Sequence, residues 1–237
     1  MNDLATLLAP RRPCASHPLR GLTILAVEDS RLACETLRLM CQHSGARLRR
    51  ADNLTAAHRH LRAYRPAAVI VDIGLPDGSG LDLIADLART RPRLGAVFGT
   101  SGEPCGNLPV LAAGADGFLA KPLDSLATFQ RTILAALPAR AAVADAPRAG
   151  GASLRPDRAA FRDDMHHVAT LLTARQDGAA IDYAAQFLRG VARAARDPVL
   201  ERAAVALARC RPGGGRRAEA AQLVAMLHAR IGRHAAI

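Results

Sequence analysis

The chain has 237 residues, of which 50% are hydrophobic and 3% aromatic. This length fits one large or two small domains, and the hydrophobic content excludes a wholly disordered chain. The formal net charge is +11, but the 32 basic residues are scattered and include a single lysine, Lys121. With so few aromatic side chains for base stacking, this charge pattern argues against nucleic acid as a partner.

The cysteines and the apolar runs indicate the compartment. The sequence contains five cysteines, namely Cys14, Cys34, Cys41, Cys105 and Cys210. Their odd number and the lack of a Cys-x-x-Cys pair are typical of a reducing compartment. The N-terminal apolar stretch is too short for a signal peptide, and no later run approaches the ~20 residues of a membrane span. We therefore expect a cytoplasmic protein that does not contact the membrane.

Residues 1–20 are punctuated by Pro and Arg and are predicted to form a flexible lead-in to a first domain, residues 21–137. In that domain, apolar runs of strand length alternate with helical patterns. The predicted strands are 22–27, 47–51, 67–72, 94–100 and 116–120. The predicted helices follow Ser30, Asn53 and Gly80 and cover about 108–113 and 123–137. Five strands alternating with five helices predict an α/β fold, a doubly wound parallel sheet covered on both faces.

The second half of the chain has a different pattern. Residues 138–156 are rich in Ala, Pro and Gly and are predicted to be a linker. After it, the apolar spacing is helical throughout, with expected helices at 157–175, 178–195, 198–210 and 217–235. We therefore predict an all-α helical bundle over residues 157–237.

Charged and hydroxyl residues stand at the predicted strand ends. They are Glu28 and Asp29 after the first strand, Asp72 and Thr100 ending the third and fourth, and Lys121 after the fifth. The carboxyl ends of parallel strands meet at one edge of a sheet, so these side chains should converge. Close carboxylates suit Mg²⁺, a lysine can bind phosphate, and an aspartate can attack phosphorus.

These motifs resemble the receiver domain of bacterial two-component response regulators over residues 22–137. The matching segments are the pair Glu28-Asp29, VIVDIGLPDGSG around Asp72, FGTS with Thr100, and FLAKP with Lys121. The resemblance implies a flavodoxin-like sheet of order 2-1-3-4-5. It also implies that Asp72 accepts a phosphoryl group from a sensor histidine kinase or a phosphotransfer protein.

The resemblance further implies a magnesium site and a switch. Asp29 and Asp72 would bind Mg²⁺ directly, the backbone carbonyl of Gly74 would be a further ligand, and Glu28 would act through water. Two residues implied to hold the phosphoryl oxygens are Thr100 and Lys121, and the aromatic implied to reorient with Thr100 is Phe118. Pro104 and Pro109 leave room for only a short fourth helix, in a region that family members often use for dimerisation.

The segment AQFLRG, residues 185–190, resembles the motif Ala-His-x-Leu-Lys-Gly of histidine-phosphotransfer domains, which are four-helix bundles. Gln186 stands at the histidine position, and an amide cannot form a phosphohistidine. The bundle is therefore interpreted as a degenerate phosphotransfer-like domain that could dock on a receiver or a kinase without reacting. His166 and His167 are rival acceptors, although the family does not place its histidine in this first helix.

The leading hypothesis is a cytoplasmic response regulator that is phosphorylated on Asp72 and acts through protein contacts of its helical bundle, with homodimerisation possible. Apart from its own phosphorylation and dephosphorylation, no enzyme activity is expected. Two alternatives stay open. One is a DNA-binding transcriptional regulator, suggested by the net charge, and the other is a phosphorelay carrier that uses His166 or His167.

Overall fold

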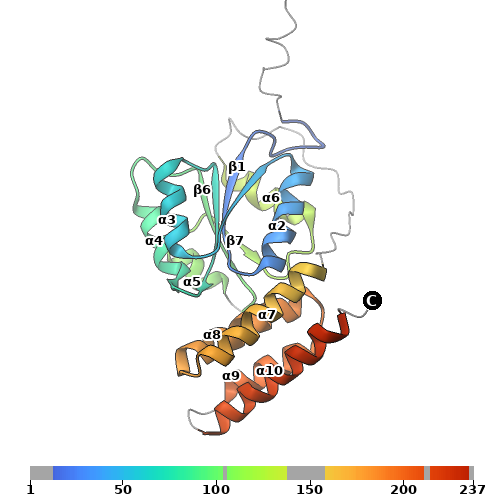
Figure 1. Cartoon of the computed structure of the whole chain (residues 1–237). Coiled ribbons are helices and arrows are strands. Elements are labelled where there is room, and N and C mark those ends of the chain that lie inside the picture. Colours follow the sequence, from blue (N-terminus) through green and yellow to red (C-terminus); the bar gives the residue numbers. More distant parts are fainter. Residues whose placement is uncertain (1–12, 104–105, 138–157, 211–213, 235–237) are drawn as a thin grey trace, which may run out of the picture.

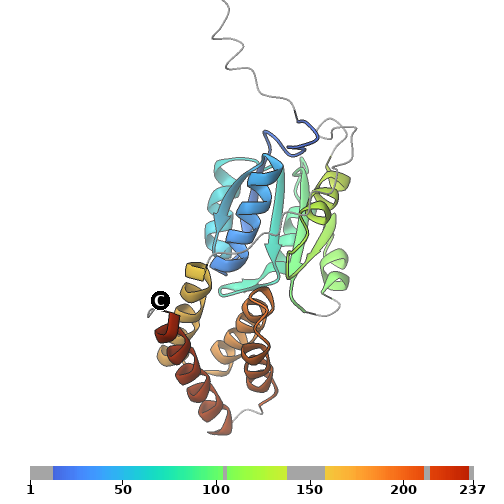
Figure 2. The ribbon, with the colours of Figure 1, turned by 90° about the vertical axis from the view of Figure 1, so that its right-hand side faces the viewer.

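The computed structural model describes residues 13–103, 106–137, 158–210 and 214–234. The predicted linker and the first twelve residues of the predicted lead-in lie outside these described residues. An α/β domain and a helical bundle lie one below the other in Figure 1, and the bundle covers one end of the sheet (Figure 2). That end is the one at which the strands finish.

The sheet of the α/β domain is parallel and five-stranded, with the order β2-β1-β3-β6-β7. Its strands are β1 (Thr23–Val27), β2 (Arg47–Ala51), β3 (Ala68–Asp72), β6 (Ala96–Ser101) and β7 (Gly117–Ala120). Counting only these strands, the order is 2-1-3-4-5, so the predicted topology is confirmed. The structure adds a two-stranded antiparallel ribbon, β4 (Gly74–Leu75) with β5 (Gly78–Ser79), which is not among the predicted strands.

Helices cover both faces of this sheet. They are α2 (Arg31–Ser44), α3 (Leu54–Ala63), α4 (Gly80–Arg89), α5 (Asn107–Ala112) and α6 (Leu126–Ala136). Ser30 and Asn53 cap α2 and α3 as predicted, because their side chains accept hydrogen bonds from Ala33 N and Ala56 N. Gly45 ends α2 with φ at 81°, in the left-handed region where a residue without Cβ is favoured.

Successive side chains of the central strands point alternately into two separate apolar layers, one on each face of the sheet. Ile24 and Ala26 point to the layer under α2 and α6, whereas Leu25 and Val27 point to the layer under α3, α4 and α5. Burial on both faces explains why these strands read as continuous apolar runs. Within the predicted lead-in, Leu19 is fully buried in the first of these layers, so ordered packing starts before residue 21.

The helices of the bundle are α7 (Arg158–Ala174), α8 (Gly178–Ala194), α9 (Pro198–Arg209) and α10 (Gly214–His234). They pack around a core of apolar side chains, which include Met165, Leu188 and Leu207. The aliphatic residues whose spacing predicts these helices are the residues that pack in the core of the bundle. The last of them, α10, starts at Gly214, a few residues before the start at 217 that the sequence predicts.

Leu32 connects the two domains. It belongs to α2 of the α/β domain but is 2% exposed and lies in the apolar core of the bundle. Leu37, five residues further along α2, is fully buried in the layer under the sheet instead. One helix therefore contributes to both cores, and the bundle packs against the α/β domain through apolar contacts.

Replacing each of these two leucines by alanine should destabilise a different core. Leu→Ala changes in a core cost about 2–5 kcal/mol. Leu32→Ala should therefore speed hydrogen exchange in α7 and α8, whereas Leu37→Ala should speed it in the sheet, as measured by mass spectrometry. Faster exchange in the sheet alone after Leu32→Ala would contradict this division.

Candidate functional site

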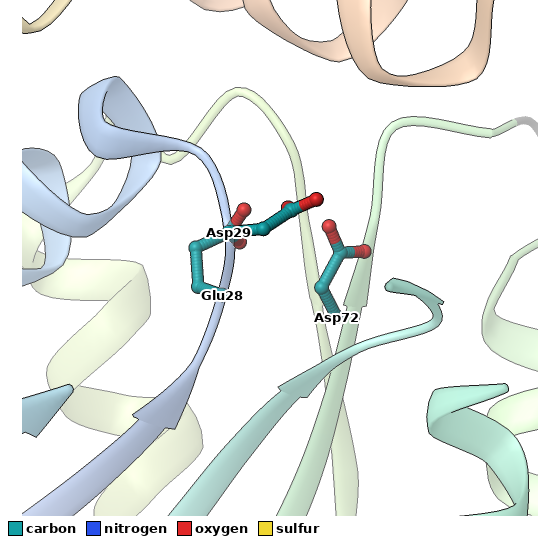
Figure 3. A group of neighbouring side chains, drawn as sticks. All are labelled: Glu28, Asp29 and Asp72. Atoms are coloured by element: carbon teal, nitrogen blue, oxygen red, sulfur yellow. The ribbon is translucent and has the colours of Figure 1, made fainter. Parts of the chain in front are cut away.

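Four of the predicted residues meet at the carboxyl ends of the strands. The ammonium of Lys121 lies 2.7 Å from a carboxylate oxygen of Glu28 and 2.7 Å from one of Asp72. Figure 3 shows Glu28 and Asp29 after β1 and Asp72 at the end of β3, with their carboxyl groups turned to the same space. These three acidic residues, here called the acidic cluster, offer ligand atoms within 4.8 Å of one another.

Burial dominates the electrostatics of this site. It raises the pKa of Glu28 well above its usual range, and Lys121 opposes this rise. Burial by itself would lower the pKa of Lys121, but the neighbouring charges of Asp72 and Glu28 more than offset it and raise that pKa. Lys121 therefore stays cationic beside Asp72, where it can attract the oxygens of an incoming phosphoryl group.

Asp29 is held by a residue of the bundle. The hydroxyl of Tyr183, on α8, donates a hydrogen bond to Oδ2 of Asp29. Burial raises the pKa of Asp29 to about 6, although this hydrogen bond opposes the rise. The other oxygen, Oδ1, is buried and accepts no hydrogen bond from the described residues.

The donor set of the acidic cluster fits magnesium. Hard divalent cations prefer carboxylate and carbonyl oxygens. The buried Oδ1 of Asp29 accepts no hydrogen bond from the described residues, so it is available as a metal ligand. Gly74, whose carbonyl the sequence suggests as a ligand, lines the same cavity as the three carboxylates.

Thr100 and Phe118 are not brought into this cluster. Thr100 pairs with Asp72 in the sheet register, but its buried hydroxyl donates to the carbonyl of Leu119 at 2.7 Å. Phe118 is half-buried and packs against the apolar layer under α3, α4 and α5. The hydroxyl of Thr100 would have to break its bond to Leu119 before it could contact a group on Asp72.

The bundle covers the carboxyl ends of the strands and leaves a cavity of about 760 Å³ between the two domains. Asp72 and Lys121 line this cavity from the α/β domain, and Gln186 lines it from α8. The degenerate histidine position predicted from the sequence therefore faces the predicted phosphoacceptor. The side chain of Asp72 is 13% exposed, and it lines this space.

Asp164 fixes the bundle to the first turn of α2. Its buried carboxylate accepts hydrogen bonds from the hydroxyl of Ser30 at 2.7 Å, from Arg31 N at 2.7 Å and from Leu32 N at 3.0 Å. The first amides of a helix have no partner within the helix, and the helix dipole favours an anion there. A carboxylate from α7 thus supplies partners that α2 lacks by itself.

A second contact fixes α8 to the loop after β6. Arg189 forms an ion pair of 2.6 Å with Glu103, and Arg193 donates to the carbonyl of Gly102. Gly190 lies against the same loop, because a Cβ built on Gly102 would be 3.7 Å from the Cα of Gly190. Two residues of α8 therefore bond to the loop that follows the carboxyl end of β6, and a third lies next to it.

Sequence reasoning missed two of these residues, Tyr183 and Asp164. Tyr183 carried a faint signal, since the chain has only two tyrosines and this one lies three residues before Gln186. Asp164 carried none that distinguishes it from its neighbour Asp163. The rival acceptors His166 and His167 are both exposed, and they line a second cavity of about 620 Å³ that Asp29 also reaches.

Residues 24–132 match the response regulator receiver domain family, and this part of the chain is a receiver domain. Among curated relatives, the KDP operon transcriptional regulatory protein KdpE of Escherichia coli (strain K12) is 32% identical over 99 residues, or 42% of this chain and 44% of KdpE. The virulence transcriptional regulatory protein PhoP of Salmonella typhimurium (strain LT2) is 33% identical over 102 residues, or 43% and 46%. The chain thus matches less than half the length of these relatives.

The solved structures also match only about half of this chain. The receiver domain of the sensor histidine kinase PA1611 from Pseudomonas aeruginosa, with a magnesium ion coordinated in its active site cleft, is 23% identical with a TM-score of 0.45 and covers 49% of this chain and 97% of its own. The signal receiver domain of a signal transduction histidine kinase from Syntrophus aciditrophicus is 27% identical with a TM-score of 0.43 and covers 48% and 91%.

Within the described parts of the chain, every helix is too short or too polar to span a bilayer.

Removal of the Asp164 carboxylate should release the bundle. Asp164→Ala leaves two amides and the hydroxyl proton of Ser30 at the start of α2 without an acceptor, at a cost of about 1–3 kcal/mol per buried group. We expect a larger radius of gyration in small-angle X-ray scattering. Asp163→Ala is the matched control, because Asp163 forms only a solvent-exposed ion pair with Arg31 and its loss should leave the radius unchanged.

Proposed function

We propose that the protein is a cytoplasmic response regulator that is phosphorylated on Asp72 and acts through protein contacts of its bundle. The observation that carries this proposal is the position of Lys121 between Glu28 and Asp72, beside Asp29, at the edge of a receiver sheet. A nucleophilic carboxylate, a fixed cation and spare oxygen ligands are what phosphoryl transfer to an aspartate requires.

The donor in this proposal is a phosphohistidine of a sensor kinase or of a phosphotransfer protein. An oxygen of Asp72 forms the new bond to phosphorus, while the phosphorus–nitrogen bond of the donor breaks and its imidazole keeps the electron pair. Lys121 binds a phosphoryl oxygen. Thr100 binds another after its hydroxyl leaves the carbonyl of Leu119, and Phe118 moves with it.

Magnesium is the proposed cofactor. Asp29, Asp72 and the carbonyl of Gly74 would hold it, with Glu28 behind them, and it would neutralise charge on the carboxylates and on the phosphoryl oxygens. The buried Oδ1 of Asp29 and the short separations within the acidic cluster support this assignment.

The bundle supplies the proposed output. In its docked position it covers the end of the sheet that a protein donor must reach, so a donor has to compete with it. Phosphorylation and docking would then bias one equilibrium, in which the released bundle presents its surfaces to a protein target. A second copy of the chain is one such target.

Transcriptional regulation is a second candidate, because the curated relatives carry that description in their names. Those relatives are matched over less than half of their length, and the similarity extends over 42–43% of this chain. Binding to a promoter fragment that weakens steeply with salt would favour this candidate. Binding to a protein target that changes with phosphorylation, without DNA binding, would favour the leading proposal.

Asp72→Asn should abolish labelling of the full-length chain by acetyl phosphate in the presence of Mg²⁺, because an amide cannot accept the phosphoryl group. Asp82→Asn makes the same chemical change on the exposed first turn of α4 and should leave labelling intact. Mass spectrometry of the intact chain measures the result. Undiminished labelling of Asp72→Asn would overturn the assignment, and an acid-labile, alkali-stable group on that variant would point to His166 or His167.

A further inference from the structure

The side-chain amide of Gln186 lies beside the phosphoacceptor loop. A Cβ built on Gly74 would collide with this amide, so the end of the Gln186 side chain lies directly against the backbone two residues after Asp72. The amide of Gly74 in turn donates to Oδ1 of Asp72 at 3.4 Å. The amide of Gln186 and the carboxylate of Asp72 therefore both lie next to the backbone of Gly74.

The position of Gln186 is fixed from both sides along α8. Tyr183, three residues earlier, is bonded to Asp29, and Arg189, three residues later, is paired with Glu103. Residues three apart share one face of a helix, so all three side chains point to the receiver. The ion pair and the hydrogen bond therefore direct Gln186 to the acidic cluster between them.

Gln186 also has free hydrogen-bonding capacity. Its side chain is exposed to the cavity of about 760 Å³ and makes no hydrogen bond within the described residues. A cavity of this size accommodates a phosphoryl group together with water. An amide offers two donors and an acceptor but cannot itself accept phosphorus, so it can orient a water molecule without forming a covalent intermediate.

We propose that Gln186 is a catalytic residue for hydrolysis of the aspartyl phosphate, and that the docked bundle is a built-in dephosphorylation element. A glutamine amide has this water-orienting role in GTPases, whose reaction is also a phosphoryl transfer to water. The inference rests on the proposed phosphorylation of Asp72. Gln186 cannot carry a phosphoryl group, and the inference gives it a role in removing one from Asp72.

The step is a simple displacement. The oxygen of the oriented water forms a bond to phosphorus, and the bond between phosphorus and the Asp72 oxygen breaks. The carboxylate of Asp72 leaves with the electron pair. The protons of the water remain on inorganic phosphate or pass to solvent, and Gln186 is unchanged at the end.

The test is the lifetime of the phosphorylated full-length chain. The protein is labelled with acetyl phosphate and Mg²⁺, the donor is removed by rapid desalting, and the loss of the aspartyl phosphate is followed by intact mass. Gln186→Ala should slow this decay roughly 10- to 100-fold, the range for loss of positioning of a reactant. The rate of labelling by acetyl phosphate should stay unchanged, because formation of the phosphoryl bond involves no attacking water.

Two further variants separate chemistry from docking. Gln186→Glu keeps the length of the side chain but places a negative charge before the phosphoryl group, so it should also slow decay. Gln222→Ala removes the same amide from an exposed site on α10 and should decay like the parent chain. Small-angle X-ray scattering shows whether the bundle remains docked in each variant, a readout that does not depend on phosphorylation.

The possible outcomes are distinct. Normal labelling with slow decay in both Gln186 variants, while the bundle stays docked, supports the inference. Normal labelling with unchanged decay in both overturns it and leaves the proposed function intact. Absence of labelling in the parent chain overturns the proposed function and, with it, this inference.

Discussion

The arrangement of the two domains depends on the hydrogen bonds between the carboxylate of Asp164, on α7, and the start of α2. This carboxylate accepts hydrogen bonds from two amides and a hydroxyl that would otherwise lack an acceptor among the described residues. This contact and the insertion of Leu32 into the bundle core place α8 across the strand ends. Tyr183 and Gln186 then reach the acidic cluster as a consequence of where α7 is fixed.

Under the proposed function, this arrangement gives the receiver site two competing states. In the docked state, Tyr183 bonds to a proposed magnesium ligand and Lys121 bridges Glu28 and Asp72. A phosphoryl group on Asp72 would compete for Lys121 and would add negative charge beneath α8. Docking and phosphorylation can thus influence each other through a few side chains, which is the physical requirement for a two-state switch. If the docked state also speeds hydrolysis, the switch resets itself.

The α/β domain could be predicted well because its signals are local. Buried parallel strands read as apolar runs, and the polar residues that follow them must meet at one edge, so Glu28, Asp29, Asp72 and Lys121 were found from order alone. The hydroxyl orientation of Thr100 could not be predicted, since it depends on the carbonyl of a strand that is adjacent only in space. The role of Asp164 could not be predicted either, because its partners lie more than 130 residues away and its neighbour Asp163 has the same side chain. The phosphotransfer-like motif did identify Gln186, but only the packing of α8 shows what it faces.

The most direct test of the docked arrangement is amide hydrogen exchange by NMR at Arg31 and Leu32 in the full-length chain. The first amides of a helix exchange rapidly when no group caps them. We expect slow exchange at both amides, comparable to that in the interior of α2, because each donates to Asp164. Rapid exchange at both, with the interior of α2 protected, would show that the bundle does not rest on the receiver and would rule out the docked arrangement.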